Sequence, residues 1–291
     1  MPIHPVPYAN LSWKMPPRLG IIAGGGALPV LITQECVKSG KTPFVIVLKG
    51  QADEENFADI PHTSFRIGAA GAVIRRLRKE GIEDLAFAGH LSKPSMENLR
   101  PDGWTASFLT KFGVFSKGDN SLLGALIEAL EGEGFHVHGV DDVLPDLLTL
   151  EGCLTDTKPS AKNETDIEAG RDAALKLGQR DIGQAVVASN GRIIAEEDTR
   201  GTDAMLGNLT NNQGAGGVMV KVVKPSQERR IDLPTIGTTT IDNAIAANLA
   251  GIALSAGSSL IIEKNAVINA ANRSGLFVVG IAGTKLSGKT K

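Results

Sequence analysis

An alternation of short apolar runs with helical patterns is the feature that most constrains the fold. Residues 19–23 (LGIIA) form an apolar run that ends at three consecutive glycines, and a helical pattern follows. Residues 44–48 (FVIVL) and 85–89 (LAFAG) predict two more strands, and 71–80 between them predicts an amphipathic helix. Strands that alternate with helices are typical of a parallel sheet with helices on its faces. We therefore expect an α/β fold.

The second half of the chain repeats this alternation after a polar break. Residues 155–166 (TDTKPSAKNETD) contain a proline and lack an apolar period, which indicates a linker. A helix is expected at 167–178, and the stretch 184–197 then carries Asn190-Gly191 between two apolar runs, which favours a tight hairpin turn. The 291 residues are enough for two domains. The expected parts are a proline-rich extension at 1–18, an N-terminal Rossmann-like nucleotide-binding domain at 19–154, the linker, and a C-terminal α/β domain at 167–291 that opens with the hairpin.

Composition excludes several classes of protein. A hydrophobic content of 42% with 21% charged residues is typical of a soluble globular chain. The net charge of −2 argues against general nucleic-acid binding, which needs a basic surface. Cys36 and Cys153 are far apart, so neither a disulfide framework nor a zinc site is expected, and reduced thiols in a cytoplasmic protein are the default. No window reaches the roughly 18 apolar residues of a membrane span, so any membrane contact is expected from the surface.

The glycine run offers a first candidate site. Gly24, Gly25 and Gly26 follow a predicted strand, so backbone N–H groups and the positive end of the next helix can approach a phosphate. The alternative is a tight turn without a ligand. The run is a poor dinucleotide fingerprint, because Pro29 stands where the last glycine of GxGxxG belongs. The second strand also ends in Lys49, where an NAD enzyme usually has an acidic residue for the ribose.

Further positions have both a functional and a structural interpretation. Asp119 or Asn120 in KGDNSLL either caps the following helix or binds a base or a metal. His90 follows a strand and a glycine, where ligands gather in open parallel sheets, but a structural histidine is an equal alternative. Asp203 in EEDTRGTDAML is either a helix cap or a ligand for a metal or for sugar hydroxyls.

Charge gathers in residues 219–237 (MVKVVKPSQERRIDLPTIG), beside a stiff Pro-Thr-Ile-Gly turn. A run of this kind is usually a solvated face. Here Lys221 belongs to an alternating strand whose face can line a cleft, and Asp232 stands just before the turn and a Thr-rich helix start. Cations for a diphosphate and a carboxylate for a metal or an attacking water are what phosphoryl displacement requires. This convergence favours a catalytic segment over a surface charge run.

Several segments, taken in order, resemble one family. The blocks LGIIAGGGALP, FAGHLSKPS, KGDNSLL, GQAVVASNGRIIAEE, GTDAML, VKVVKPSQERRIDLPTIG and NLAGIALSAG are similar to those of the UDP-2,3-diacylglucosamine pyrophosphatases of the lipid A pathway. This is the form unrelated to the calcineurin-like enzyme of the same step. The resemblance implies hydrolysis of the diphosphate of UDP-2,3-diacylglucosamine to UMP and 2,3-diacylglucosamine 1-phosphate (lipid X). It also implies dependence on a divalent cation, usually Mg²⁺.

The resemblance implies roles for individual residues. Asp232 is the expected catalytic carboxylate and, with Asp203, an expected metal ligand. Lys221, Lys224 and Arg229 are expected to offset charge on the phosphoryl oxygens. The resemblance also implies that the N-terminal domain takes UDP, that the C-terminal domain takes the acylated sugar, and that the two close on each other. The residues expected to bind substrate are Gly24, Gly25, Gly26, Ala27, His90, Asp119, Asn120, Gly201, Thr202, Asp203, Gln227 and Thr235.

Two rival functions stay open from the sequence. A nucleotide-dependent oxidoreductase fits the glycine loop but not the broken fingerprint, and a non-catalytic carrier of acylated sugar nucleotides fits binding without turnover. The acyl chains of the expected glycolipid imply an aliphatic chamber in the second domain and a peripheral contact with the inner face of the inner membrane. The oligomeric state is open, with a homodimer as one option.

Overall fold

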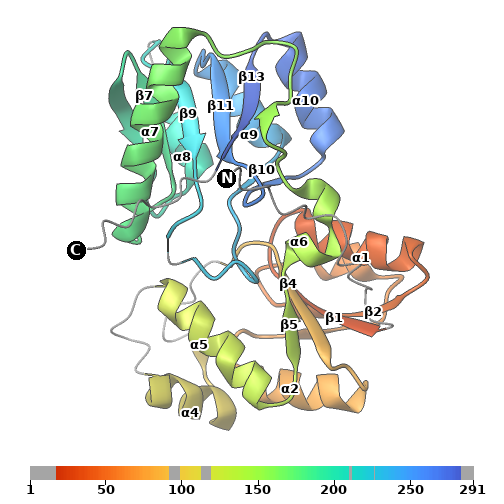
Figure 1. Cartoon of the computed structure of the whole chain (residues 1–291). Coiled ribbons are helices and arrows are strands. Elements are labelled where there is room, and N and C mark those ends of the chain that lie inside the picture. Colours follow the sequence, from red (N-terminus) through yellow and green to blue (C-terminus); the bar gives the residue numbers. More distant parts are fainter. Residues whose placement is uncertain (1–17, 92–98, 113–118, 210–211, 226, 283–291) are drawn as a thin grey trace, which may run out of the picture. The chain divides into compact units, whose positions relative to one another are not determined.

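The computed structural model describes residues 18–91, 99–112, 119–209, 212–225 and 227–282 (Figure 1). The chain forms two compact units: residues up to 107 with 130–143, and residues 108–129 with the chain from 144 onward. Helices α4 (Gly103–Phe112) and α5 (Asp119–Gly132) each contain residues of both units. No helix within these described ranges has the length and apolar character needed to span a membrane.

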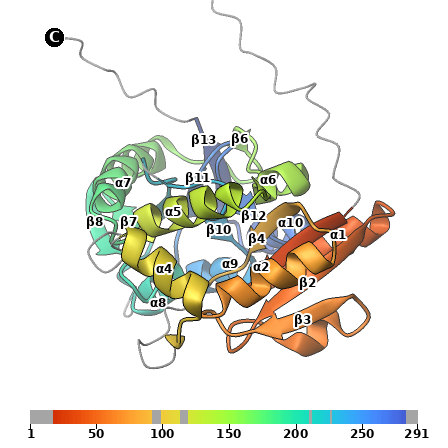
Figure 2. The ribbon, with the colours of Figure 1, turned by 90° about the horizontal axis from the view of Figure 1, so that it is seen from below.

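The first unit is built on a parallel sheet. Its elements are β1 (Arg18–Ala23), α1 (Leu28–Lys38), β2 (Thr42–Leu48), η1 (Glu54–Phe57), β3 (His62–Phe65), α2 (Ala70–Lys79), β4 (Asp84–Ala88), β5 (His136–His138) and α6 (Val140–Val143). The five strands are all parallel and lie in the order β3-β2-β1-β4-β5. Figure 2 shows β3 beside β2 at one end of this order. The strand order reverses between β1 and β4, which is where open parallel sheets bind ligands. The expected N-terminal parallel sheet is confirmed.

The centre of this sheet is tightly covered. A Cβ atom on Gly20 of β1 would lie 2.7 Å from a methyl group of Leu85 and 2.8 Å from one of Ile82. The same Cβ would lie 3.1 Å from Leu77, so α2 packs directly on the backbone of β1. Helix α1 buries Ile32 completely against the sheet unit. The central strand therefore carries an unbroken apolar run, because a parallel strand buried on both faces has no side that faces water.

The second unit combines a mixed sheet with helices that cover it. Its elements are η3 (Pro145–Leu147), β6 (Gly152–Cys153), α7 (Ala161–Gln179), β7 (Ala185–Ser189), β8 (Arg192–Glu196), α8 (Thr202–Gly207), β9 (Val218–Lys221), β10 (Thr235–Ile236), α9 (Thr238–Ala246), β11 (Gly251–Ser255), β12 (Leu260–Ile261), α10 (Lys264–Arg273) and β13 (Phe277–Ile281). The main sheet has the order β6-β13-β11-β9-β7-β8, and β10 pairs with β12 in a small second sheet. Strands β9, β11 and β13 are parallel, whereas β6 and β7 run against their neighbours.

Two apolar cores hold this sheet in place. Helix α7 packs on one face, with Ala174 and Leu177 against Val220 of β9, while the core on the other face includes Met219 and Ile241 of α9. The alternation along β9 thus sends its side chains to opposite cores. The hairpin expected at Asn190-Gly191 is confirmed: it joins β7 to β8, and both residues have positive φ, at 53° and 69°.

The helix expected at 167–178 begins earlier than the apolar pattern indicates. In the structure α7 starts at Ala161, so its first turns occupy part of the stretch 155–166 that was interpreted as a linker. Ser160 caps this start, because its side chain accepts from the backbone N–H of Asn163 while the Asn163 side chain accepts from the N–H of Ser160. The pattern misses these turns because they are mostly exposed and carry no apolar period.

Candidate functional site

A buried polar cluster lies at one edge of the main sheet of the second unit. Strand β7 is antiparallel to both β8 and β9, so β8 and β9 run the same way and end at the same edge. Glu197 directly follows β8, and Lys221 is the last residue of β9. The start of α8 and the segment that leads into β10 also reach Lys221. The lysine cluster, as it is called below, consists of Glu197, Thr202, Asp203, Lys221 and Asp232.

Lys221 is the centre of this cluster and has only 7% of its surface exposed. Its Nζ donates to Thr202 Oγ1 at 2.9 Å and to the backbone oxygen of Thr235 at 3.0 Å. Burial lowers the pKa of the Lys221 ammonium below its ordinary value, and the carboxylates of the cluster act in the opposite direction. A cation held in a dry site among acids has the electrostatic character needed to stabilise a developing phosphoryl charge.

Glu197 belongs to the cluster although the sequence did not mark it. Its Oε2 accepts from the backbone N–H of Gln184 at 2.7 Å and of Ala185 at 3.1 Å, and its Oε1 accepts from the Thr202 hydroxyl at 2.5 Å. Both Glu197 and Thr202 are 8% exposed. One signal was present in the sequence: Glu197 lies two residues after Ala195 and four after Ile193. These are the less exposed positions of β8, so the Glu197 side chain is on the same, inward-facing side of the strand.

Asp232, the expected catalytic carboxylate, is half-buried and positioned by an amide. Its Oδ2 accepts from Nε2 of Gln227 at 2.6 Å, and Gln227 is 9% exposed. Over the described ranges, Oδ1 of Asp232 has no hydrogen-bond donor. Gln227 was expected to bind substrate, and the structure brings it into direct contact with the expected catalytic group. Asp232 also lies close enough to Lys221 to favour its charged form.

Asp203 is held by a neighbouring helix and does not cap its own. The N-cap of α8 is Gly201, with φ at 88°, and no side chain caps it, so the cap interpretation of Asp203 is wrong. Oδ1 of Asp203 accepts from the hydroxyl of Thr240 in α9 at 3.3 Å. Thr235 reaches the cluster through its backbone, since its hydroxyl donates to the oxygen of Leu233 at 2.9 Å. The structure thus brings Thr202, Asp203 and Thr235 together around Lys221, as well as Asp232.

The other two expected cations bind elsewhere in the second unit. Lys224 forms an ion pair with Asp181 just after α7, with Nζ 2.8 Å from Oδ1. Arg229 is exposed and donates from Nη2 to the backbone oxygen of Gly257 at 2.8 Å. Neither contact joins these side chains to the lysine cluster. Their role on phosphoryl oxygens stays a prediction.

The glycine turn of the first unit contacts His90. The backbone N–H of Gly24 donates to Ala88 O at 2.8 Å, and Gly25 and His90 exchange backbone hydrogen bonds at 2.8 and 3.0 Å. Two of the amides expected to approach a phosphate are therefore already bonded. The exposed residues Gly26 and Ala27 differ, because in the described part of the chain their N–H groups have no acceptor and no side chain caps α1. They keep the amides that an anion at a helix start can use.

The remaining expected nucleotide ligands are untested by the geometry. Asp119 and Asn120 are the first residues of α5, and their side chains lie outside the described part of the structure. They belong to the second unit, whereas the glycine turn belongs to the first. The choice between a helix cap and a ligand at these positions therefore stays open.

Asp203 and Asp232 are the side chains expected to bind the divalent cation that the resemblance implies. Across the described residues, no three or more His, Cys, Asp or Glu side chains are arranged to hold a metal ion. Asp203 and Asp232 each use one oxygen in a hydrogen bond, with Thr240 and Gln227, and each has a second oxygen without a donor among the described residues. Mg²⁺ is commonly held by one or two carboxylates together with water and substrate phosphates. Each of these carboxylates therefore has one oxygen to offer to a cation whose other ligands are water and substrate phosphates.

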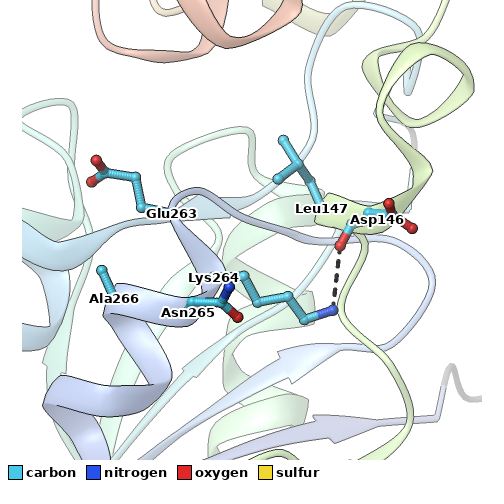
Figure 3. Close-up of a pocket in the computed structure, with 6 residues that line it drawn as sticks. All are labelled: Asp146, Leu147, Glu263, Lys264, Asn265 and Ala266. Carbon is cyan, nitrogen blue, oxygen red and sulfur yellow. Dashed lines mark hydrogen bonds between the residues drawn. The ribbon is translucent and has the colours of Figure 1, made fainter. Parts of the chain in front are cut away.

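A separate cavity of about 410 Å³ lies at the start of α10. It is lined by Asp146, Leu147, Glu263, Lys264, Asn265 and Ala266 (Figure 3). Lys264 reaches across it, and its Nζ donates to the backbone oxygens of Asp146 and Leu148, both at 3.3 Å. None of the expected site residues lines this cavity, so the lysine cluster and the cavity are different features of the second unit.

These features define a class of protein. The chain is a two-domain α/β protein in which a parallel-sheet unit carries a glycine turn and a mixed-sheet unit carries a buried lysine among carboxylates. The model of the LpxI N-terminal domain matches residues 18–147, and that of the LpxI C-terminal domain matches residues 150–279. The chain belongs to the LpxI family.

A curated relative supports this membership over nearly the whole length. The UDP-2,3-diacylglucosamine pyrophosphatase LpxI of Caulobacter vibrioides is 38% identical over 273 residues, which cover 91% of this chain and 97% of the relative. Among solved structures, the UDP-glucose 4-epimerase of Thermus thermophilus in complex with NAD matches 50% of this chain and 42% of its own, at 16% identity and a TM-score of 0.29. The match to the precorrin-6A reductase CobK covers 92% of this chain and 88% of that protein, at 12% identity and a TM-score of 0.32. At such TM-scores neither likeness carries an argument.

Proposed function

We propose that the protein hydrolyses the diphosphate of UDP-2,3-diacylglucosamine. The observation that carries this proposal is the 38% identity, over 91% of the chain, with a UDP-2,3-diacylglucosamine pyrophosphatase. Water adds to one phosphorus of the P–O–P link and the other phosphate leaves, so the products are UMP and 2,3-diacylglucosamine 1-phosphate. The reaction needs no oxidant or reductant, which agrees with a glycine turn that lacks a dinucleotide fingerprint.

The lysine cluster supplies the groups that this displacement uses. Asp232, whose carboxylate is oriented by Gln227, accepts a proton from the attacking water or orients it. The buried Lys221 ammonium offsets the negative charge that grows on the phosphoryl oxygens. Asp203 and Asp232 would hold Mg²⁺, which when bound supplies Lewis-acid stabilisation of the same oxygens. The residues Gly26 and Ala27 would hold an anionic part of the nucleotide through their N–H groups.

Product identification tests the proposal directly. The purified protein is incubated with UDP-2,3-diacylglucosamine labelled in the uridine, with Mg²⁺ and in a second arm with excess chelator. Release of labelled UMP together with 2,3-diacylglucosamine 1-phosphate is the expected result, and the chelator is expected to suppress it. Tight binding of intact substrate without turnover supports the rival carrier function instead. Quenching of nicotinamide fluorescence by the protein supports an oxidoreductase.

We also propose that the protein acts in the cytoplasm at the inner face of the inner membrane. The argument is the chemistry of the substrate, since each methylene of an acyl chain gains about 0.8 kcal/mol on leaving water and the chains hold the glycolipid in a bilayer. Sedimentation with phospholipid vesicles, with and without substrate in the bilayer, measures this contact. Light scattering after size-exclusion chromatography measures whether the protein is a monomer or a homodimer.

A further inference from the structure

We infer that Glu197 and Thr202 are positioning residues that hold the Lys221 ammonium in place for the reaction. The inference rests on the proposed hydrolysis, and it changes the role expected for Thr202, from binding substrate to acting through Lys221. Glu197 has no role assigned by the sequence patterns. The three side chains form one directed chain of hydrogen bonds, from the Lys221 Nζ to the Thr202 hydroxyl and on to Glu197 Oε1.

The backbone hydrogen bonds of Glu197 fix the direction of this chain of hydrogen bonds. Oε2 of Glu197 accepts two backbone N–H groups, from Gln184 and Ala185, so the carboxylate cannot turn without losing them. A hydroxyl has one proton, and Thr202 donates its proton to Glu197 Oε1 because a carboxylate only accepts. The Thr202 oxygen is therefore presented to Lys221 as an acceptor at 2.9 Å.

This arrangement leaves Lys221 one N–H group to give. An ammonium has three N–H donors. Within the described ranges, one goes to Thr202 and one to the backbone oxygen of Thr235, and the third has no protein acceptor. Because two of the N–H groups are held by hydrogen bonds, the third N–H group points in a defined direction. A donor with a fixed direction is what stabilisation of a phosphoryl oxygen requires.

A purely structural role explains this chain poorly. Lys221 stands on the face of β9 that also carries the fully buried Met219, where an apolar side chain would pack without desolvating a charge. Buried ion pairs are often replaced by apolar residues without loss of stability, and they are weak devices for holding a fold. A functional role at the site better explains a buried lysine that is hydrogen-bonded to a hydroxyl, which is in turn bonded to a carboxylate held by backbone amides.

The test compares Thr202→Val, which removes the hydroxyl at nearly the same volume, with Thr202→Ser, which keeps it. Glu197→Gln keeps an oxygen for the backbone amides but replaces the acceptor for Thr202 by a donor. We expect Thr202→Val and Glu197→Gln to lower kcat for UMP release by about 10-fold or more while KM changes by less than about 3-fold, and Thr202→Ser to recover most of kcat. Thr165→Val on the exposed face of α7 is the matched control and is expected to leave kcat unchanged.

A double-mutant comparison separates positioning from direct contact. If Thr202 and Glu197 act through Lys221, Thr202→Val causes no further loss of kcat when it is added to Lys221→Met. Unchanged kcat in Thr202→Val, additive losses in the double variant, or a rise in KM alone would each overturn the inference and leave the proposed hydrolysis intact. A wild-type protein that releases no UMP overturns both. Should Glu197→Gln fail to fold, as judged by circular dichroism, the two Thr202 variants decide the question.

Discussion

Gln227 donates its side-chain amide to Oδ2 of Asp232 at 2.6 Å and accepts the backbone N–H of Lys224 at 2.9 Å with its side-chain oxygen. Both ends of one buried amide are therefore used, and the orientation of the amide is set by the backbone it is bonded to. The NH₂ group of Gln227 must therefore point to Asp232, and this hydrogen bond holds the Asp232 carboxylate in one orientation. The contact therefore joins two parts of the charged segment after β9, Lys224 and the carboxylate proposed to act on water.

We predict that Gln227→Glu lowers the rate of hydrolysis. The change replaces a donor to Asp232 by a second carboxylate of almost identical shape, so a hydrogen bond becomes a repulsion between like charges. We expect kcat to fall by about 10-fold or more, with the protein still folded. Initial rates of UMP release at saturating substrate measure the effect.

The matched control for this change is Gln179→Glu, at the exposed end of α7, which adds the same charge away from the cluster. It is expected to keep the wild-type kcat. Equal rates for Gln227→Glu and the wild type would remove Gln227 from the positioning of Asp232.

Asp232→Ala is predicted to stop turnover without preventing binding. The substitution removes the group proposed to handle the proton of the attacking water, a contribution of about 100- to 10,000-fold in rate for a general base. Substrate is expected to stay bound because other groups hold its nucleotide and acyl chains. Product release and equilibrium binding of the labelled substrate are measured on the same preparation, with Asp242→Ala on the exposed face of α9 as control. Turnover at the wild-type rate would exclude Asp232 from the mechanism.

Gly24→Ala is predicted to destabilise the first unit through a contact with backbone. A Cβ atom at this position would lie 2.6 Å from the carbonyl oxygen of His90 and 3.0 Å from Leu91. The strand ends would have to separate, which costs about 1–3 kcal/mol in an overpacked site. Gly103→Ala at the start of α4 is the matched control, because a Cβ there meets nothing within 4 Å. Thermal unfolding should separate the two variants by several degrees, and equal midpoints would contradict the prediction.

Local patterns in the sequence were sufficient for three strands of the first sheet and for the hairpin of the second unit. The runs at 19–23, 44–48 and 85–89 became β1, β2 and β4, because a strand buried on both faces must be apolar throughout. The turn at Asn190-Gly191 was equally visible, since its positive φ angles suit these residue types. Each of these predictions depends on residues that are close neighbours in the chain.

The site was only partly predictable, because its contacts join residues far apart in the chain. Asp203 looks like a helix cap from its position, but Thr240, which lies 37 residues further on, donates to it. Lys224 looks like part of a cationic site, but its ion pair is with Asp181, 43 positions away. The alternate positions of β8 give a hint of Glu197, but its bonds to Gln184 and Ala185 form only when β7 and β8 pair. No local period reports such pairs, since they arise when separate elements pack together.

The two cysteines are predicted to differ in reactivity. Cys36 in α1 is fully buried, and burial raises the pKa of its thiol to about 11 from 9.0, so it stays protonated and shielded at neutral pH. Cys153 in β6 is partly exposed. Alkylation of the native protein at pH 8, followed by mass spectrometry, should label Cys153 first. In guanidinium both should react, and early labelling of Cys36 in the native protein would contradict its burial.

The raised pKa of Cys36 also predicts a loss of stability at high pH. Between pH 9 and about 11 the unfolded chain loses the thiol proton while the native protein keeps it, so the unfolded state binds fewer protons and the free energy of unfolding falls. The loss is absent below pH 9 and reaches at most about 3 kcal/mol once the pH exceeds the native pKa. Denaturant unfolding at several pH values from 8 to 11 measures it. Cys36→Ala should show a shallower decline than the wild type, because the two proteins share every other titrating group; parallel curves would refute the assignment to Cys36.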